Sequence, residues 1–226
     1  MELVQAERTP AMNRAHEDER VQRIVANFLR APSTSMAKLL AQALWGNWDP
    51  RSAPSLAKMA GVAPAHATIA ADLATDGLAI ANDADEDHGR RCRGAVLEAL
   101  SEQLLRRRAL SVLPEQQVGP LPDPPWTDGL SDPIDIIAVA AAHEFYECKA
   151  SVRDIASKHI EQFRIVGEVC PDDSLVGFIT LQATGLLVGT LMAFNRTCTL
   201  HGYALEDFVE MAASTPGVMA EVGSAA

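Results

Sequence analysis

The 226-residue chain is 48% hydrophobic, enough for a sizeable core, and carries a formal net charge of −11. The whole excess lies in residues 111–226, which hold 5 basic and 16 acidic side chains, whereas residues 1–110 hold 14 of each. An acidic half is unfavourable for a stand-alone nucleic-acid binder, because phosphate contacts dominate affinity. We therefore expect metal ions, the first half or a partner protein to bring any nucleic acid to it.

Two further classes of protein are disfavoured by composition. The longest apolar stretches are too short for a membrane span, and no signal-peptide pattern opens the chain. Cysteines without C-x-x-C spacing argue against a zinc knuckle or a disulfide framework and favour a reducing, cytoplasmic location. These cysteines are Cys92, Cys148, Cys170 and Cys198.

The first elements in chain order are helical. Residues 1–17 are expected to form a flexible tail. Apolar residues recur at helical spacing over 18–30 and again over 35–45, which predicts two amphipathic helices. Gly46 to Pro50 has the composition of a turn.

Residues 55–80 resemble a helix-turn-helix of the winged type. Gly61 stands where a tight turn between helices needs a positive φ, and Pro64 can begin the next helix. A strand is expected to start at Asp76-Gly77-Leu78, and the acidic residues 82–87 then form a wing tip or linker. The resemblance implies a helical, winged-helix-like domain over residues 18–85.

The function of this module stays open between DNA binding and protein docking. Its expected recognition helix begins Pro64-Ala65-His66-Ala67-Thr68, without the Arg, Lys, Asn or Gln that read base edges. A plain helical hairpin that binds nothing fits the same pattern.

The second half alternates helices and strands. A strong helix is expected over 88–110, and the Pro- and Gly-rich residues 113–129 are expected to form a loop. Residues 216–226 are expected to form a flexible tail. The elements predicted in between are strands over 134–140, 144–150, 175–181 and 197–203, and helices over 152–168, 183–195 and 204–213.

Three charged residues mark the first two of these strands. Asp135 enters one apolar run, and Glu147 and Lys149 end the next. A hairpin brings all three to one end, and residues two apart on a strand share a face. Two carboxylates can hold a divalent cation, and a neighbouring lysine can orient a water. This pattern is typical of phosphodiester hydrolysis.

The order of elements and the motifs resemble the PD-(D/E)xK nuclease superfamily, in its Mrr- and RecB-type branch. The resemblance covers about residues 91–213 and implies a restriction-endonuclease-like α/β core over residues 88–215, with a mixed central sheet flanked by helices. Family members often carry a glutamate on the first core helix, and Glu98 fits that pattern. The matching segments are Pro133-Ile134-Asp135-Ile136-Ile137, Phe145-Tyr146-Glu147-Cys148-Lys149 and Gly94-Ala95-Val96-Leu97-Glu98.

The resemblance implies a Mg²⁺- or Mn²⁺-dependent endonuclease that cuts DNA rather than RNA. Asp135, Glu147 and the Cys148 backbone carbonyl would bind the metal, Lys149 would position the attacking water, and Glu98 would bind the same ion directly or through water. No other cofactor is expected. The resemblance also implies a homodimer or a subunit of a larger complex, acting in restriction, phage defence or mobile-element biology.

Other interpretations remain. Asp135 can be a strand-end cap, and Glu147 and Lys149 can form an ion pair with no catalytic role. The chain can also be a helix-turn-helix regulator whose second half is an inactive, nuclease-like dimerisation domain, or a structural subunit of a complex. The dense arginines at 90–93 and 106–108 can contact phosphates, and a helix-end charge effect explains those at 106–108 equally well.

Overall fold

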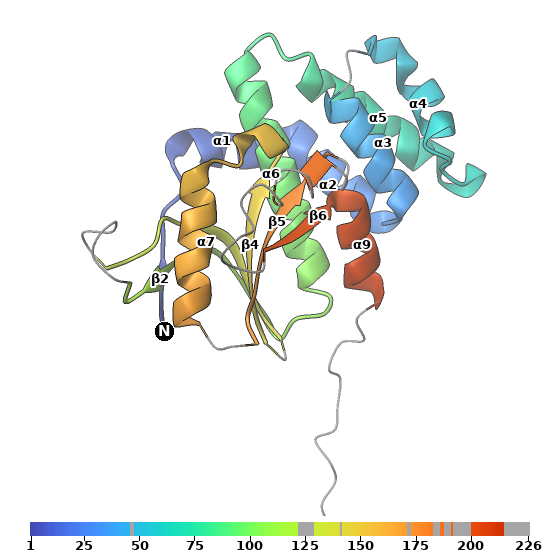
Figure 1. The fold of residues 1–226 in the computed structure, drawn as a ribbon. Coiled ribbons are helices and arrows are strands. Elements are labelled where there is room, and N and C mark those ends of the chain that lie inside the picture. The colour runs from blue at the N-terminus through green and yellow to red at the C-terminus, as the bar shows by residue number, and fades with distance from the viewer. Residues whose placement is uncertain are drawn as a thin grey trace, which may run out of the picture.

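A computed structural model describes residues 1–45, 48–121, 129–140, 142–170, 173–182, 186–187, 191 and 200–214. Its centre is a six-stranded mixed sheet in the order β1-β2-β3-β4-β5-β6 (Figure 1). The first four strands are antiparallel neighbours, whereas β4–β5 and β5–β6 are parallel. The strands are β1 (Glu2–Gln5), β2 (Ser111–Gly119), β3 (Ile134–Val139), β4 (His143–Lys149), β5 (Leu175–Thr180) and β6 (His201–Ala204).

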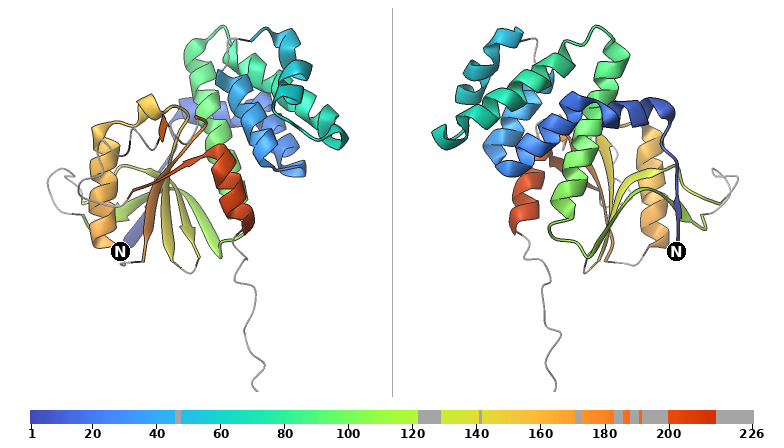
Figure 2. Two further views of the ribbon diagram at one scale, coloured as in Figure 1. Left: turned by 45° about the vertical axis from the view of Figure 1, so that its right-hand side comes forward. Right: turned by 180° about the vertical axis from the view of Figure 1, so that it is seen from behind.

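Helices cover both faces of the sheet (Figure 2). One face packs against α7 (Ser157–Val169), and the other packs against α6 (Glu86–Leu105) and α9 (Leu205–Ser214). The remaining helices lie beyond α6 and α9, as a group beside one end of the sheet. They are α1 (Pro10–Glu17), α2 (Glu19–Arg30), α3 (Thr34–Trp45), α4 (Ala53–Met59) and α5 (Ala67–Ala81).

Two hydrophobic cores correspond to these layers. The smaller core lies between α7 and the sheet and includes Phe145, Phe163 and Phe178. The larger core joins the helical first half to the opposite sheet face, with residues as distant in sequence as Leu40 and Phe208. The helical segment and the sheet therefore share one continuous apolar interior.

The expected flexible tail over residues 1–17 is wrong. Residues Glu2–Gln5 form β1, which pairs with β2 in antiparallel register, and residues Pro10–Glu17 form α1. Thr9 caps α1 by accepting a hydrogen bond from the Met12 backbone N–H. The segment is ordered by a strand more than a hundred residues away, which local pattern does not reveal.

The expected strand from Asp76 is also wrong, because α5 runs without a break from Ala67 to Ala81. Gly77 lies in mid-helix, where a Cβ would stand 2.9 Å from the Ala43 Cβ of α3. It permits close helix packing rather than starting a strand. Gly61 does adopt the predicted positive φ, at +70°. A short connection that includes Gly61 joins α4 to α5, and no strand occurs among the described residues of 18–85.

The expected loop over 113–129 is wrong in its first part. Residues Ser111–Gly119 form β2, paired with β1 on one side and β3 on the other. Pro114 stays in register opposite Ile136, while Glu115 is left out of the ladder with a φ of +51°. Pro and positive φ usually interrupt strands, and here neighbours on both sides hold the strand together.

The remaining second-half elements agree closely with expectation. β3, β4, β5, α7 and α9 begin and end within a few residues of their predicted bounds, α7 starting later, after a short 3₁₀ turn at Val152–Asp154. The tail expected over 216–226 lies outside the described residues, and so does most of the helix expected over 183–195. Among the described residues, no helix is both long and apolar enough to cross a membrane.

The mixed α/β class is confirmed, with a six-stranded mixed sheet and, in the described part of the chain, eight labelled α-helices. Its finer assignment to a restriction-endonuclease-like core stays a prediction.

Candidate active site

The ends of β3 and β4 bring Asp135, Glu147 and Lys149 together, as predicted. Ile136 pairs with Tyr146, so the preceding and following residues, Asp135 and Glu147, are level on adjacent strands. The Lys149 Nζ lies 2.5 Å from Glu147 Oε1 and 4.0 Å from Asp135 Oδ2. Period-two alternation along β4 therefore presents one lysine to two carboxylates on a single face of the sheet.

Cys148 lies between the two charged residues of β4. Its backbone N–H donates to Asp135 Oδ2 over 2.6 Å, while its thiol side is buried in the larger core. The N–H and C=O of one strand residue point to the same side, so the Cys148 carbonyl also lies on the Asp135 side. This agrees with the carbonyl ligand implied by the resemblance.

Gln162 of α7 supports the start of β3. Its side chain is 3% exposed, and its Nε2 donates to the Asp132 backbone oxygen over 2.9 Å. The residue is thus buried beside the site rather than on a solvated helix face. It holds the turn that leads into Asp135.

The carboxylates are held in a low-dielectric setting. Burial, and next the neighbouring Glu147, raises the pKa of Asp135 well above its usual range. Burial also raises the pKa of Glu147, against the opposing effect of Lys149. For Lys149 burial lowers the pKa, but Asp135 and Glu147 outweigh it and the net shift is upward. Lys149 therefore stays protonated. Its single positive charge faces two carboxylates, Asp135 and Glu147.

One oxygen of the site lacks a partner. Glu147 Oε2 is buried and accepts no hydrogen bond within the described part of the chain. Buried polar atoms in proteins are nearly always paired, and a bound cation is one partner that would satisfy this oxygen. The Glu147–Lys149 ion pair engages the other oxygen, Oε1.

Glu98 joins this cluster from α6, as its motif predicted. It is 6% exposed and close enough to help raise the pKa of both Asp135 and Glu147. Its Oε2 lies 2.8 Å from His16 Nε2 and 3.8 Å from an Arg8 guanidinium nitrogen. The N-terminal segment, expected to be a tail, thus supplies basic groups to the site.

Glu115 is a fourth carboxylate that sequence reasoning missed. The register of β2 on β3 places it level with Asp135, and its Oε1 accepts from Arg8 Nε over 2.9 Å. Burial, and next Glu98, raises the pKa of Glu115. Its positive φ is uncommon for a residue with a side chain and costs about 1–3 kcal/mol. No sequence signal marked it, because its segment is rich in proline and was expected to be a loop.

Arg8 is expected to hold the apo cluster together. Arg8→Gln removes the cation between Glu98 and Glu115, which leaves two largely buried carboxylates facing each other. We expect the free energy of unfolding, measured in urea with EDTA, to fall by about 1–3 kcal/mol. Arg14→Gln is the matched control, because Arg14 is an exposed residue of the neighbouring α1. Equal effects of the two substitutions would contradict this role of Arg8.

The residues present fit a divalent cation that prefers oxygen. Asp135, Glu147 and the Cys148 carbonyl offer hard oxygen ligands of the kind that Mg²⁺ and Mn²⁺ take. The raised carboxylate pKa values and the unpaired Glu147 Oε2 are both relieved by added positive charge. The ligand atoms of Asp135, Glu147 and Glu98 do not all lie within 4.8 Å of one another, and Glu98 Oε2 faces His16 and Arg8.

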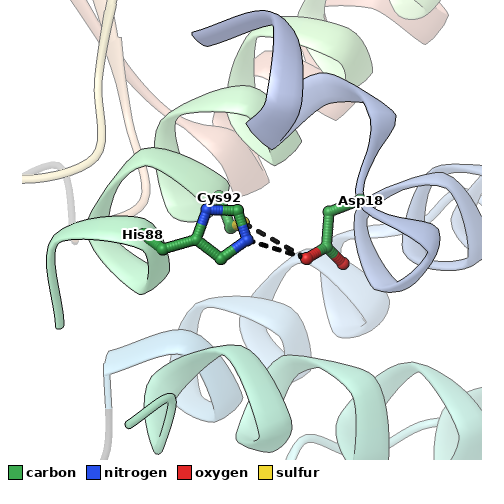
Figure 3. Close-up of side chains that lie close together, drawn as sticks. All are labelled: Asp18, His88 and Cys92. Atoms are coloured by element: carbon green, nitrogen blue, oxygen red, sulfur yellow. Dashed lines mark hydrogen bonds and ion pairs between the residues drawn. The ribbon is translucent and has the colours of Figure 1, made fainter. Parts of the chain in front are cut away.

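A different trio does converge to that distance in the described part of the chain: Asp18, His88 and Cys92 (Figure 3). Asp18 Oδ2 lies 3.0 Å from His88 Nε2, but also 2.7 Å from an Arg20 guanidinium nitrogen. Burial raises the pKa of Cys92 to about 12, so the thiol stays protonated at neutral pH. Asp18 is also paired with Arg20, and the hydrogen bonds of this cluster join the start of α2 to α6.

Comparison with known proteins adds little to this geometry. No family model matches the chain, and a search of curated proteins found no match. Among solved structures the chain is similar to protein VC1899 from Vibrio cholerae, with 11% sequence identity and a TM-score of 0.45. The similarity covers 95% of this chain and 60% of that protein. Any functional argument therefore rests on the residues of this chain.

Proposed function

We propose that the protein is a divalent-metal-dependent nuclease that hydrolyses phosphodiester bonds of DNA. The observation that carries the proposal is the buried group of Asp135, Glu147 and Lys149, with Glu147 Oε2 lacking any partner in the described residues. The Lys149 contact engages Glu147 Oε1 and leaves Oε2 open to a cation.

Each residue has a distinct role in this proposal. Asp135 and Glu147 hold Mg²⁺ or Mn²⁺ together with the Cys148 carbonyl, and Cys148 N–H fixes the orientation of the Asp135 carboxylate. Glu98 stands behind them on α6 and contributes through water. When bound, the metal lowers the pKa of a water and offsets charge on the phosphate.

Lys149 acts on the water and the phosphate rather than on the metal. Its raised pKa keeps it protonated at neutral pH, so it orients the water by donating a hydrogen bond and does not accept its proton. Its charge also offsets the negative charge that develops on the phosphate oxygens. We further propose that the protein works in the cytoplasm as a homodimer or beside a partner protein, since two sites would cut both strands in one encounter.

The direct test is incubation of the purified chain with supercoiled plasmid, linear duplex and single-stranded circular DNA. We expect nicking or cutting in about 5 mM Mg²⁺ or Mn²⁺, and none in EDTA. An excess of metal is used because protein-bound Mg²⁺ usually keeps several waters and has few protein ligands. Cleavage that persists in EDTA would exclude this mechanism. Absence of cleavage on every DNA, with and without metal, would count against the proposal.

A further inference from the structure

A continuous groove leads away from Lys149 on the surface of the protein. A hollow of about 590 Å³ is lined by Lys149, by arginines of α6 and by Arg153. It shares Trp45, Ser151 and Arg153 with a second hollow of about 640 Å³. That hollow in turn shares Trp45, Gln182 and Leu186 with a third, of about 470 Å³. Trp45 therefore lies at the junction of all three.

The part of the groove next to Lys149 is basic, although the chain as a whole is acidic. Arg90, Arg91, Arg93 and Arg153 line it, and Asp154 is the one acidic residue among its lining residues. Arg90 and Arg91 form ion pairs with the exposed Asp87, at 3.2 and 3.9 Å. Such exposed pairs are weak, so these cations are available to phosphates.

The other arginine cluster does not line this groove. Arg108 is buried against Glu144, whereas Arg106, which pairs with Glu102 at 2.6 Å, and Arg107 are exposed elsewhere. The arginines at 90–93 thus differ in position from those at 106–108. Only the first group opens into the groove beside the candidate active site.

Trp45 provides an aromatic surface at the junction. The residue is 39% exposed, its Nε1 donates to the Ala150 carbonyl over 3.1 Å, and the Arg93 guanidinium lies 4.9 Å from the ring centroid. These contacts fix the ring at the end of α3. Arg93 Nε is itself buried without a hydrogen-bond acceptor among the described residues.

Beyond Trp45 the groove becomes mainly apolar. Trp48 and Leu186 line the third hollow and are 36% and 56% exposed. The cations can contact the phosphates of a nucleic acid, and the exposed aromatic and apolar side chains beyond them can contact its unpaired bases. A base stacks on an aromatic side chain only when one face of the base is free. Bases inside a duplex have no such free face.

We propose that this groove binds single-stranded nucleic acid next to the scissile phosphate, with phosphates on Arg90, Arg91 and Arg153 and an unpaired base on Trp45. This deepens the proposed function, on which the position of the scissile phosphate rests. The binding itself requires neither metal nor cleavage.

Binding is tested by fluorescence anisotropy in EDTA. The two substrates are a 5′-labelled single strand of about 15 nucleotides and a blunt duplex of the same sequence. Protein is added up to about 100 μM, roughly the weakest dissociation constant of non-specific binding. We expect the single strand to bind at least about tenfold more tightly than the duplex. The Arg91→Glu/Arg153→Glu double variant should bind the single strand at least about tenfold more weakly. Its salt dependence should be shallower by about 1.4 in log–log slope, since each phosphate contact contributes about 0.7.

The matched control is Arg51→Glu/Lys58→Glu, which changes the charge equally at exposed residues of the helical half. It should bind within about threefold of the wild type. Trp45→Phe keeps an aromatic ring and should weaken binding less than Trp45→Leu, which should lose about tenfold. Thermal melting of each variant verifies that it is folded.

Three results would overturn the inference: no binding of the single strand, a duplex that binds as tightly, or test and control variants that weaken binding equally. Failure of the proposed hydrolysis looks different. Single-strand binding that the groove variants abolish, without cleavage in any metal, supports the groove and rejects the nuclease. Metal-dependent cutting that the groove variants leave unchanged supports the nuclease and rejects the groove.

Discussion

Lys149→Met is expected to reduce metal-dependent DNA cleavage by at least about 10²–10³-fold, the loss typical when one preorganised electrostatic group leaves a catalytic site. Methionine keeps much of the length of the side chain but removes the charge that offsets the phosphate oxygens. The measurement is the single-turnover rate on labelled DNA in Mg²⁺ or Mn²⁺. Lys158→Met is the matched control, because Lys158 is exposed and pairs with Asp132 at 3.7 Å nearby.

Lys149→Met also leaves two buried carboxylates without their cation, so the variant can lose stability as well as activity. Asp135→Asn separates these effects. It keeps an oxygen to accept the Cys148 N–H and keeps the Lys149–Glu147 contact, while it removes one metal-binding charge. Loss of cleavage in a folded Asp135→Asn protein, with Lys158→Met active, supports the roles assigned here. Full activity of either site variant would exclude the site.

The second large effect concerns stability without metal. Asp135→Asn is expected to raise the melting temperature in EDTA at pH 8 by about 3–6 °C, equivalent to about 1–2 kcal/mol. The reason is that burial, and then Glu147, makes the ionised Asp135 unfavourable in the folded protein. A neutral amide avoids that cost. Differential scanning fluorimetry measures the difference.

The pH dependence of this gain has a definite sign. The folded pKa of Asp135 lies above its usual value of 3.8, so the folded protein holds this proton more tightly than the unfolded chain does. The cost of the ionised carboxylate therefore appears as the pH rises from 3.8 through the folded pKa. We expect the advantage of Asp135→Asn to be largest at pH 8 and to shrink steadily as the pH is lowered.

Added metal should reverse the order of stabilities. At a concentration about 100 times its dissociation constant, Mn²⁺ should stabilise the wild type by about 2.7 kcal/mol, or about 5–10 °C, and Asp135→Asn much less. A purely structural ion-pair cluster predicts the opposite pattern: Asp135→Asn less stable than the wild type in EDTA, and a wild type indifferent to Mn²⁺.

The candidate site was predictable from the sequence because its main residues are close in sequence. Asp135, Glu147 and Lys149 lie on two strands joined by a short turn, and strand periodicity sets which side chains share a face. Glu98 was found from its motif and is buried beside them. Strand periodicity was enough to group the residues of β3 and β4, whereas Glu98 was expected from the motif of the family resemblance.

The errors all involve contacts across long stretches of chain. Glu115 reaches the site because β2 pairs with β3, and Arg8 because β1 pairs with β2 over more than a hundred residues, where nothing within either segment signals the pairing. The same pairing stabilises a strand through Pro114 that local propensity disfavours. Gly77, expected at a strand start, lies in a helix because α3 packs against it.

The sequence alone determined the mixed α/β class, most element positions after residue 130 and the grouping of Asp135 with Glu147 and Lys149, because each follows from periodicity over a few neighbouring residues. Only the tertiary structure decided that residues 1–17 belong to the sheet and site, that Arg90–Arg93 face a groove while Arg108 is buried, and that Glu147 Oε2 lacks a partner. Burial and pairing depend on elements that meet only when the chain is folded, since their free energy comes from contacts between distant segments.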